Sequence, residues 1–247
     1  ANELSKILNA KREKRGAFMF ETPEAKIILN EKGNVVDIVL RQRFDAECLI
    51  EEFMLAANEC VAETMTWLDV PFIYRVHEEP ADDKISKLMI MVNNFGYDYK
   101  LKGQKGVAKL LQKILKDHDL NEVGLSQEDI TRRGIVNKAL IRTMAKAKYQ
   151  ETNIGHFGLG SKCYTHFTSP IRRYPDLLVH RLIKEFMFNE SFIDVTDKLG
   201  FYNNKVNIAG INSSKTERRA EKLERDACDY KKCEYMERFY GDKFVGT

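Results

Sequence analysis

The chain has 247 residues, which allows one large domain or two small ones with a sizeable buried core. Its composition, 43% apolar and 31% charged, is that of a soluble globular protein, and no apolar run approaches the roughly 20 residues of a membrane span. The formal net charge is only +3, so bulk attraction to nucleic acid is weak and any polyanion site must come from local clustering.

Two strands, a long helix and a third strand are predicted first. Residues 17–43 alternate as strands do, and the cluster from Asn30 to Asn34 predicts a hairpin turn between them. Asp45 is predicted to cap a long amphipathic helix, and FIYRV after Pro71 predicts a short buried strand. Six residues fall close to one face of this helix: Leu49, Phe53, Ala56, Cys60, Thr64 and Trp67.

The rest of the chain is predicted to be mainly helical. Residues 81–117 predict two helices separated by Asn93-Asn94-Phe95-Gly96, and the capping signature SQED at Ser126 begins another. The run LLVHRLIKEFMF predicts a further helix, and Ser213 or Ser214 is predicted to begin a last helix of about 25 residues or more towards Tyr240. The expected fold class is α+β, with a small, mainly antiparallel sheet covered by several helices.

The five cysteines are odd in number, scattered, and never spaced as CxxC. Zinc sites need close ligand pairs, so this spacing argues against structural zinc, and a reducing cytoplasm is the expected location. The chain opens on a charged helical pattern rather than a signal peptide, and both ends predict a piece of a longer protein.

The densest stretch is YTHFTSPIRRYPDLLVH, residues 164–180. Pro170 and Pro175 fix the backbone φ angle on either side of Arg172 and Arg173, which lowers the entropy lost when an arginine is held in place. A guanidinium presents a planar fork of donors that matches phosphate oxygens. If a helix begins near Pro175, its free N–H groups add a second element that attracts anions.

Thr168, Ser169 and His166 can donate further hydrogen bonds to such an anion. The alternative interpretation is structural: the two arginines would form salt bridges with Asp176 and other acids. The residues alone leave both interpretations open.

The run GHFGLGSKCYTHFTSPIRRYPDLLVHRLI closely resembles the signature of the ribonuclease II/R (RNB) family of 3′-to-5′ exoribonucleases, particularly its ribonuclease R branch. The resemblance extends to GAFMFETPEAKIIL, RFDAECLIEEFMLAANECVA, PFIYRVHEEP and RRAEKLERDACDY, in the same order. It implies that residues 1–240 are the later part of the catalytic domain. Residues 241–247 would begin a following OB-type RNA-binding domain.

The resemblance also implies roles for single residues. Arg172 matches the family's catalytic arginine, which holds the scissile phosphate, and Glu224 matches a glutamate near the reaction centre. Phe20 matches an aromatic that stacks on the terminal bases, while Glu51 and His77 match positions lining the RNA channel. Without the resemblance, Phe20 would be read as core, the two glutamates as solvated or salt-bridged acids, and His77 as a satisfied polar residue.

One RNA-binding prediction comes from the residues themselves. Between residues 131 and 150 there are six basic side chains and no acidic one. Lys138, Arg142 and Lys146 lie at i, i+4 and i+8, which predicts a one-sided basic stripe along the path of the RNA backbone. A solvated helix face is the alternative. Arg173, Thr168 and Ser169 complete the predicted RNA-binding set. For Arg173, a purely structural role is the alternative.

Hydrolysis of a phosphodiester needs a nucleophilic water and neutralisation of the charge that builds on the phosphate, which divalent ions held by carboxylates supply. The resemblance implies Mg²⁺ held by an aspartate cluster in the earlier part of the catalytic domain. The acidic pairs Glu51-Glu52, Glu78-Glu79 and Asp82-Asp83 lack the spacing of that cluster. We therefore expect the metal ligands upstream and expect this chain to be inactive alone.

The expected function of the parent protein is processive hydrolysis of single-stranded RNA to nucleoside 5′-monophosphates. Its partner would be RNA, with no membrane and no obligate protein partner evident. Two alternatives stay open. The first is a non-catalytic RNA-binding or regulatory protein that kept the channel and lost the aspartates. The second is an unrelated phosphate-binding metabolic enzyme, disfavoured because the chain has no Gly-rich phosphate loop or Walker-type lysine.

Overall fold

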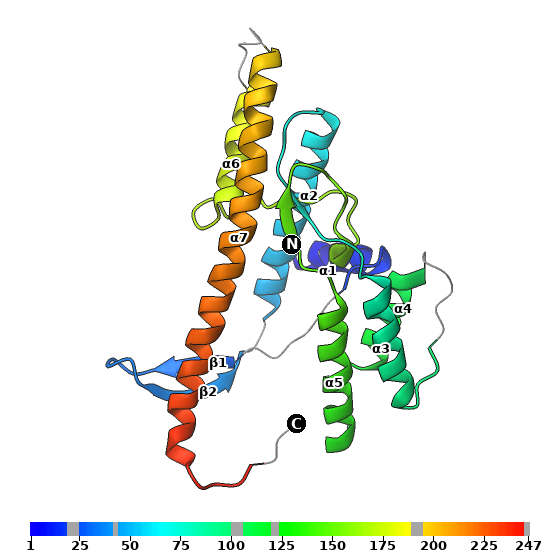
Figure 1. Ribbon diagram of the computed structural model, residues 1–247, viewed down its shortest axis with the longest axis vertical. Coiled ribbons are helices and arrows are strands. Elements are labelled where there is room, and N and C mark those ends of the chain that lie inside the picture. The colour runs from blue at the N-terminus through cyan, green and yellow to red at the C-terminus, as the bar shows by residue number, and fades with distance from the viewer. Residues whose placement is uncertain (19–24, 42–43, 100–105, 120–123, 189–194, 245–247) are drawn as a thin grey trace.

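The computed structural model describes residues 1–18, 25–41, 44–99, 106–119, 124–188 and 195–244, and the fold is α+β, as predicted (Figure 1). The strands form two antiparallel pairs, β1 (Ala25–Leu29) with β2 (Val35–Leu40) and β3 (Tyr74–Val76) with β4 (Lys148–Gln150). The helices are α1 (Asn2–Lys14), α2 (Asp45–Trp67), α3 (Asp82–Asn94), α4 (Val107–Asp117), α5 (Gln127–Thr143), α6 (Tyr174–Ile183) and α7 (Val195–Met236).

The predicted hairpin and the predicted helix start at Ser126 are both confirmed. The Asn30 side chain accepts hydrogen bonds from the N–H groups of Lys32 and Asn34 at 3.0 Å each, and Gly33 has a φ of +78° that favours glycine. At the start of α5, the Ser126 hydroxyl accepts from the Asp129 N–H at 3.1 Å, and the Asp129 carboxylate accepts from the Ser126 N–H.

Helix α2 differs from its prediction at the cap and on its buried face. The N-cap is Phe44, whose N–H donates to the Glu47 carboxylate, so Asp45 is the first helical residue instead of the cap. Four residues of α2 are buried, Glu52, Asn58, Ala62 and Met65, whereas Trp67 is 82% exposed.

The physical reason is that two of the four are polar side chains with buried partners. The Glu52 carboxylate pairs with Arg12 of α1, and the Asn58 amide donates to the Tyr164 hydroxyl at 3.0 Å. A buried polar group is tolerated when it is hydrogen-bonded, and an apolar periodicity does not register it.

Helix α7 is one element of 42 residues, so the predicted start at Ser213 or Ser214 is wrong. Both serines lie within the helix because it packs closely on β4 there. The Ser214 hydroxyl donates to the Gly210 carbonyl and accepts from the Tyr149 N–H, each at 2.8 Å. A side chain at Gly210 would come within 3.0 Å of the Tyr149 carbonyl oxygen, so glycine permits this approach.

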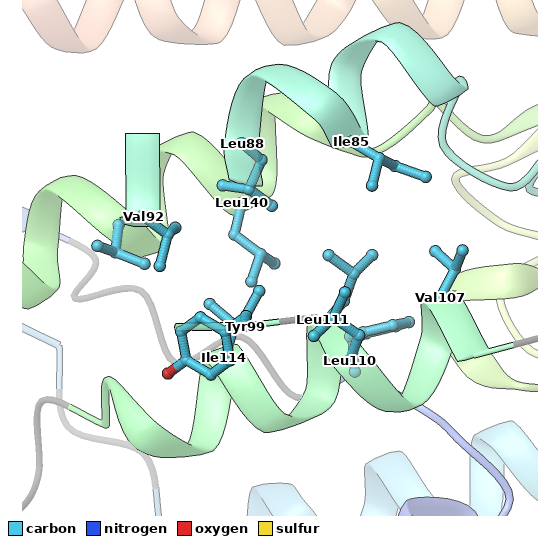
Figure 2. Close-up of a cluster of buried hydrophobic side chains, with 11 residues drawn as sticks. Ile85, Leu88, Val92, Tyr99, Val107, Leu110, Leu111, Ile114 and Leu140 are labelled. Atoms are coloured by element: carbon cyan, nitrogen blue, oxygen red, sulfur yellow. The ribbon is translucent and has the colours of Figure 1, made fainter. Parts of the chain in front are cut away.

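The described residues form two separate hydrophobic cores. Helices α3, α4 and α5 enclose the first, and Figure 2 shows their side chains pointing towards one another. Its buried residues include Ile85, Leu88, Val92, Leu110, Leu111, Ile114, Val136 and Leu140. The predicted pair of helices on either side of Asn93–Gly96 corresponds to α3 and α4.

The second core supports the stretch from Tyr164 to His180. It lies between α2, the β3–β4 pair, α6 and α7, and its buried residues include Met65, Phe72, Ile73, Val76, Leu178, Leu182 and Val206. In Figure 1, α6 lies beside the first part of α7, and the β1–β2 hairpin lies beside the last part of the same helix. No helix in the described ranges combines the length and the apolarity that a bilayer crossing demands.

Candidate anion-binding site

The N-terminus of α6 and the turn before it, residues 168–176, are called the cradle here, because the sequence predicts an anion site at this place. Arg173 is the N-cap and Pro175 stands in the first turn, so the helix begins where the sequence predicts. The Ser169 carbonyl accepts from the N–H groups of Arg172 at 3.3 Å and Arg173 at 3.1 Å, which closes a tight turn. Asp176 is fully buried beneath this turn, and its Oδ1 accepts from the Ser169 N–H at 2.8 Å.

The two adjacent arginines have different surroundings. The Arg173 guanidinium donates to Asp176 Oδ1 at 2.8 Å, so the structural interpretation holds for this arginine. Arg172 is exposed, and its side chain has no hydrogen bond or ion pair with any residue in the described ranges. Arg172 is therefore the uncompensated cation at a helix N-terminus, where an anion is favoured by both charge and dipole.

Three buried polar atoms of the same stretch have no hydrogen-bond partner among the described residues. They are the Thr168 hydroxyl oxygen, Arg173 Nε and Asp176 Oδ2. Buried polar atoms are nearly always paired, so three such atoms within nine residues indicate a polar site with bonding capacity left over. Ser169 lies in the same turn and is half-buried.

Three histidines and two tyrosines form a connected cluster of rings. The rings of His77 and His156 stack at 5.1 Å, and His156 meets Tyr164 edge to face at 5.3 Å. The His166 ring in turn meets Tyr164 at 5.7 Å and Tyr149 at 5.6 Å, both edge to face. The Tyr149 hydroxyl and His166 Nδ1 are hydrogen-bonded at 2.7 Å.

Arg75 connects this cluster to α7. Its guanidinium carbon lies 4.5 Å from the centre of the Tyr149 ring, and its Nη1 is 2.5 Å from the Glu217 carboxylate. The backbone N–H of Arg75 donates to the Tyr164 carbonyl at 2.8 Å. Glu217 is thus the acid that α7 contributes here, and its charge offsets that of Arg75.

The cluster holds its histidines neutral at physiological pH. Burial, followed by the charges of Arg173 and Arg75, lowers the pKa of His166 to about 2. Burial, followed by the charges of His77 and Arg75, lowers the pKa of His156 to about 3. Burial also raises the pKa of the Tyr149 hydroxyl to about 12, so the phenol keeps its proton.

The structure gives His77 a fully satisfied ring. Its Nε2 lies 2.7 Å from the Ala145 carbonyl oxygen, and its Nδ1 accepts from the Gly158 N–H at 2.8 Å. Burial is the main reason that the pKa of His77 is lowered, and both ring nitrogens are engaged by backbone. Only the face or edge of the ring could meet an RNA chain, so the predicted RNA contact of His77 stays a prediction.

The other residues implied by the resemblance are spread over the fold. Glu51 is half-buried in the first half of α2, next to the Glu52–Arg12 pair. Glu224 is exposed on α7, two helical turns beyond Glu217, and no described residue contacts its carboxylate through a hydrogen bond or ion pair. Phe20 lies outside the described residues. The role of each stays a prediction.

The basic stripe is shorter than predicted. Helix α5 ends at Thr143, and Met144 is extended, so Lys146 does not continue the helical face of Lys138 and Arg142. All three side chains are exposed, while Val136 and Leu140 on the other side of α5 are buried in the first core. The role of this surface in RNA binding stays a prediction.

Sequence reasoning missed Tyr149, Arg75 and Glu217 because each is placed by a partner far along the chain. Tyr149 and His166 are 17 residues apart, and Arg75 and Glu217 are 142 residues apart. A signal was present in the unusual density of His and Tyr between residues 149 and 166. No group of three or more His, Cys, Asp or Glu in the described parts of the chain is placed to hold a metal ion.

A protein-family profile described as "RNB domain" matches residues 1–189. Ribonuclease R of Thermotoga maritima is 42% identical over 247 residues, covering 99% of this chain and 33% of that protein. Ribonuclease R 1 of Lactococcus lactis is 41% identical over 244 residues, covering 99% of this chain and 28% of that protein. The chain thus spans about a third of the length of these curated relatives.

Solved structures resemble the fold over almost the whole chain. Mycoplasma genitalium RNase R in complex with double-stranded RNA has a TM-score of 0.88 at 29% identity, covering 99% of this chain and 42% of that one. The same protein with ribose-methylated single-stranded RNA has a TM-score of 0.84 at 29% identity, covering 95% and 35%. Yeast Ssd1, described as a pseudonuclease, is similar in fold alone, with a TM-score of 0.54 at 20% identity, covering 86% and 26%.

Proposed function

The chain belongs to the RNB domain family, and on that premise we propose that the whole protein is a 3′-to-5′ exoribonuclease. It would hydrolyse single-stranded RNA processively and release nucleoside 5′-monophosphates. The proposal is supported by relatives of 42% and 41% identity named ribonuclease R, and by the likeness to an RNase R solved with RNA.

The observation that carries the proposal to a residue is the unequal surroundings of Arg172 and Arg173. Arg173 is held inside the fold by the buried carboxylate of Asp176. Arg172, exposed at the N-terminus of α6 without a partner among the described residues, is available to a phosphate. A guanidinium stabilises the additional negative charge on a phosphate under attack more than the charge of the resting ester.

The reaction balances as a hydrolysis. A water oxygen forms a bond to the phosphorus of the last linkage, and the bond from that phosphorus to the O3′ of the preceding nucleotide breaks. One proton of the water passes to this O3′, so the shortened RNA ends in a 3′-hydroxyl and the released nucleotide keeps its 5′-phosphate. Arg172 holds the non-bridging oxygens during this change, which orients the phosphate and offsets its charge.

A divalent metal ion, which we propose to be Mg²⁺, would activate the water and offset phosphate charge when bound. The described residues of this chain do not fit such an ion, because they bring no three suitable ligands together. We propose that its ligands belong to a part of the protein upstream of this chain. A cytoplasmic location is also proposed, supported by the five free cysteines.

The test is an assay of the whole protein with Mg²⁺ and an RNA that carries a 5′ label and an unpaired 3′ tail. The expected result is stepwise shortening from the 3′ end with release of nucleoside 5′-monophosphates. Release of 3′-monophosphates, shortening from the 5′ end, or an intact label pattern would refute the proposal. The matched pair Arg172→Ala and Arg173→Ala separates the arginine that contacts RNA from the one that supports the fold.

The alternative is an RNA-binding or regulatory protein without hydrolysis. The similarity of fold to a yeast protein described as a pseudonuclease shows that the fold does not decide between the two. The whole protein would then bind the tailed RNA and leave its length unchanged at every Mg²⁺ concentration. An aspartate cluster in the sequence upstream of Ala1 favours the enzyme, and its absence there favours the binding protein.

A further inference from the structure

His166 engages one of its two ring nitrogens. Its Nδ1 is hydrogen-bonded to the Tyr149 hydroxyl at 2.7 Å, while its Nε2 has no partner among the described residues. The side chain keeps partial solvent exposure, so the second nitrogen is not sealed inside the cluster. The direction of the Tyr149 bond therefore determines whether Nε2 carries a proton or a lone pair.

The surroundings of Tyr149 settle that direction. The residue is only 5% exposed, and His166 Nδ1 is the one hydrogen-bond partner of its hydroxyl in the described ranges. If Nδ1 carried the proton, it would donate to the phenol oxygen, and the phenol proton would be buried without an acceptor. If the phenol donates to Nδ1, the phenol proton has its acceptor and Nε2 carries the one N–H proton of the neutral ring. The second arrangement avoids an unsatisfied donor.

Tyr149 is itself fixed from two sides. Its N–H donates to the Ser214 hydroxyl of α7 at 2.8 Å, and it pairs with Arg75 across the β3–β4 sheet. The Arg75 guanidinium covers the ring, and Glu217 holds that guanidinium in turn. The phenol therefore presents its hydroxyl to His166 from a rigid position, which pre-organises the imidazole.

His166 lies six residues before Arg172 in the stretch that leads into α6. Burial is the main reason that the pKa of His166 is lowered, and the charges of Arg173, Arg75, His156 and Arg172 lower it further, in decreasing order. A neutral ring that donates through Nε2 offers an anion a hydrogen bond without adding a positive charge. A protonated ring would repel these arginines.

We propose that Tyr149 is a positioning residue that holds His166 as the Nε2–H tautomer, so that His166 donates a hydrogen bond to the RNA phosphate bound by Arg172. This inference deepens the proposed function and rests on it for the identity of the anion. His166 is the residue that touches RNA, and Tyr149 acts only through it. The tautomer itself does not depend on any nuclease activity.

The first experiment determines the tautomer in the 247-residue chain by ¹⁵N NMR of the histidine ring nitrogens at pH 7. The expected spectrum shows an unprotonated Nδ1 and a protonated Nε2 for His166. In Tyr149→Phe the two tautomers should become mixed, because the donor to Nδ1 is gone. A wild-type spectrum with the proton on Nδ1 would overturn the proposal whatever the protein does to RNA.

The second experiment measures the affinity of the whole protein for a labelled single-stranded oligoribonucleotide without Mg²⁺, so that no cleavage interferes. Tyr149→Phe should weaken binding about 3- to 10-fold, within the range expected for one hydrogen bond to a charged group. The matched control is Tyr164→Phe, which removes a buried hydroxyl of the same cluster that bonds Asn58 instead of His166. It should change affinity less than about 2-fold, in keeping with the lack of contact with His166 nitrogen.

Two substitutions of His166 complete the test. His166→Gln places an amide N–H near the position of Nε2 and should keep most of the affinity, whereas His166→Phe has no donor and should lose about 10-fold. Equal loss in the Gln and Phe variants, or equal loss in Tyr149→Phe and Tyr164→Phe, would show a structural role only and overturn the proposal. If affinity and tautomer behave as expected but no RNA is shortened with Mg²⁺, the proposed hydrolysis fails while this inference stands.

Discussion

Arg173 donates a 2.8 Å hydrogen bond to Asp176, whose carboxylate is fully buried beneath the turn that precedes α6. The same carboxylate oxygen also accepts the Ser169 N–H, so Asp176 connects Arg173 to the turn before α6. The turn that this carboxylate stabilises fixes the backbone at Arg172, whose side chain is exposed.

Replacement of Arg173 by alanine should unfold the chain more readily than replacement of Arg172. The Asp176 carboxylate would be left buried without its cation, a change that lowers the free energy of unfolding by about 3 kcal/mol in comparable pairs. Arg172→Ala removes an exposed side chain and should change it by less than about 0.5 kcal/mol. Urea unfolding followed by circular dichroism compares the two, and equal midpoints would contradict the division of roles.

Loss of the Arg172 side chain should affect turnover much more than RNA binding. In the whole protein, Arg172→Ala should lower kcat at least about 100-fold, because the guanidinium interacts most strongly with the charge of the transition state. The dissociation constant for RNA should rise less than about 5-fold, since one phosphate contact is a small part of strand binding. Single-turnover assays and anisotropy measure the two separately. Turnover close to that of the wild type would remove Arg172 from its assigned role.

The 247-residue chain on its own should not hydrolyse RNA. Among its described residues no three ligands converge on a metal position, and an arginine alone does not activate water. Incubation with Mg²⁺ and a 3′-tailed RNA, followed by separation of nucleotides, should show no monophosphates. Released nucleotides that disappear on addition of EDTA would show that this chain holds the metal after all.

The stability of the fold should decrease as the pH falls below about 6.5. The pKa values of His156 and His166 in the folded chain, about 3 and about 2, lie below the ordinary value of 6.5, so the unfolded chain takes up protons first. Their contribution is complete above pH 6.5 and is lost progressively on the way down. Between pH 7 and pH 5.5 each ring should lower the free energy of unfolding by about 1 kcal/mol.

Urea unfolding at several pH values measures this slope, and His166→Gln should reduce it by about the share of one proton. The matched control is His180→Gln, which changes an exposed histidine outside the cluster. A slope that is the same in His166→Gln as in the wild type would show that His166 is not held neutral by its surroundings.

Charge reversal at Lys138, Arg142 and Lys146 tests the basic surface at the end of α5. If these side chains follow the RNA backbone, the triple glutamate variant should lower the slope of log affinity against log salt by about 2, as expected for three lost phosphate contacts to a single strand. The same slope in the variant and the wild type would show a solvated surface. Because Lys146 lies beyond the helix, its single reversal is informative by itself.

Local chemistry made part of this structure predictable. The turn from Asn30 to Asn34 and the cap at Ser126 each depend on hydrogen bonds between residues four or fewer positions apart. The cradle was predictable for the same reason, since its prolines and arginines act within one turn of α6. Such contacts are written in short sequence patterns.

The parts that sequence reasoning missed depend on packing between distant segments. The buried face of α2 is set by Arg12 and Tyr164, which satisfy Glu52 and Asn58. The continuity of α7 across Ser213 depends on its close approach to β4 at Gly210. Neither partner can be chosen from periodicity alone, because several faces of each helix carry comparable apolar residues.

Because α7 is one continuous helix, it fixes both the distance and the rotation between the two parts of the molecule that it contacts. Glu217 of this helix pairs with Arg75, which packs on the histidine and tyrosine cluster. Lys231 and Glu234 form hydrogen bonds with the β1–β2 hairpin. One residue inserted in α7 between these two contact sites would turn the hairpin by about 100° around the helix axis, relative to the cluster, and move it by about 1.5 Å along the axis. Seven inserted residues would nearly restore the angle but move the hairpin about 10 Å away. The number of residues between the two contact sites is therefore constrained by the angle around the helix axis as well as by the distance along it.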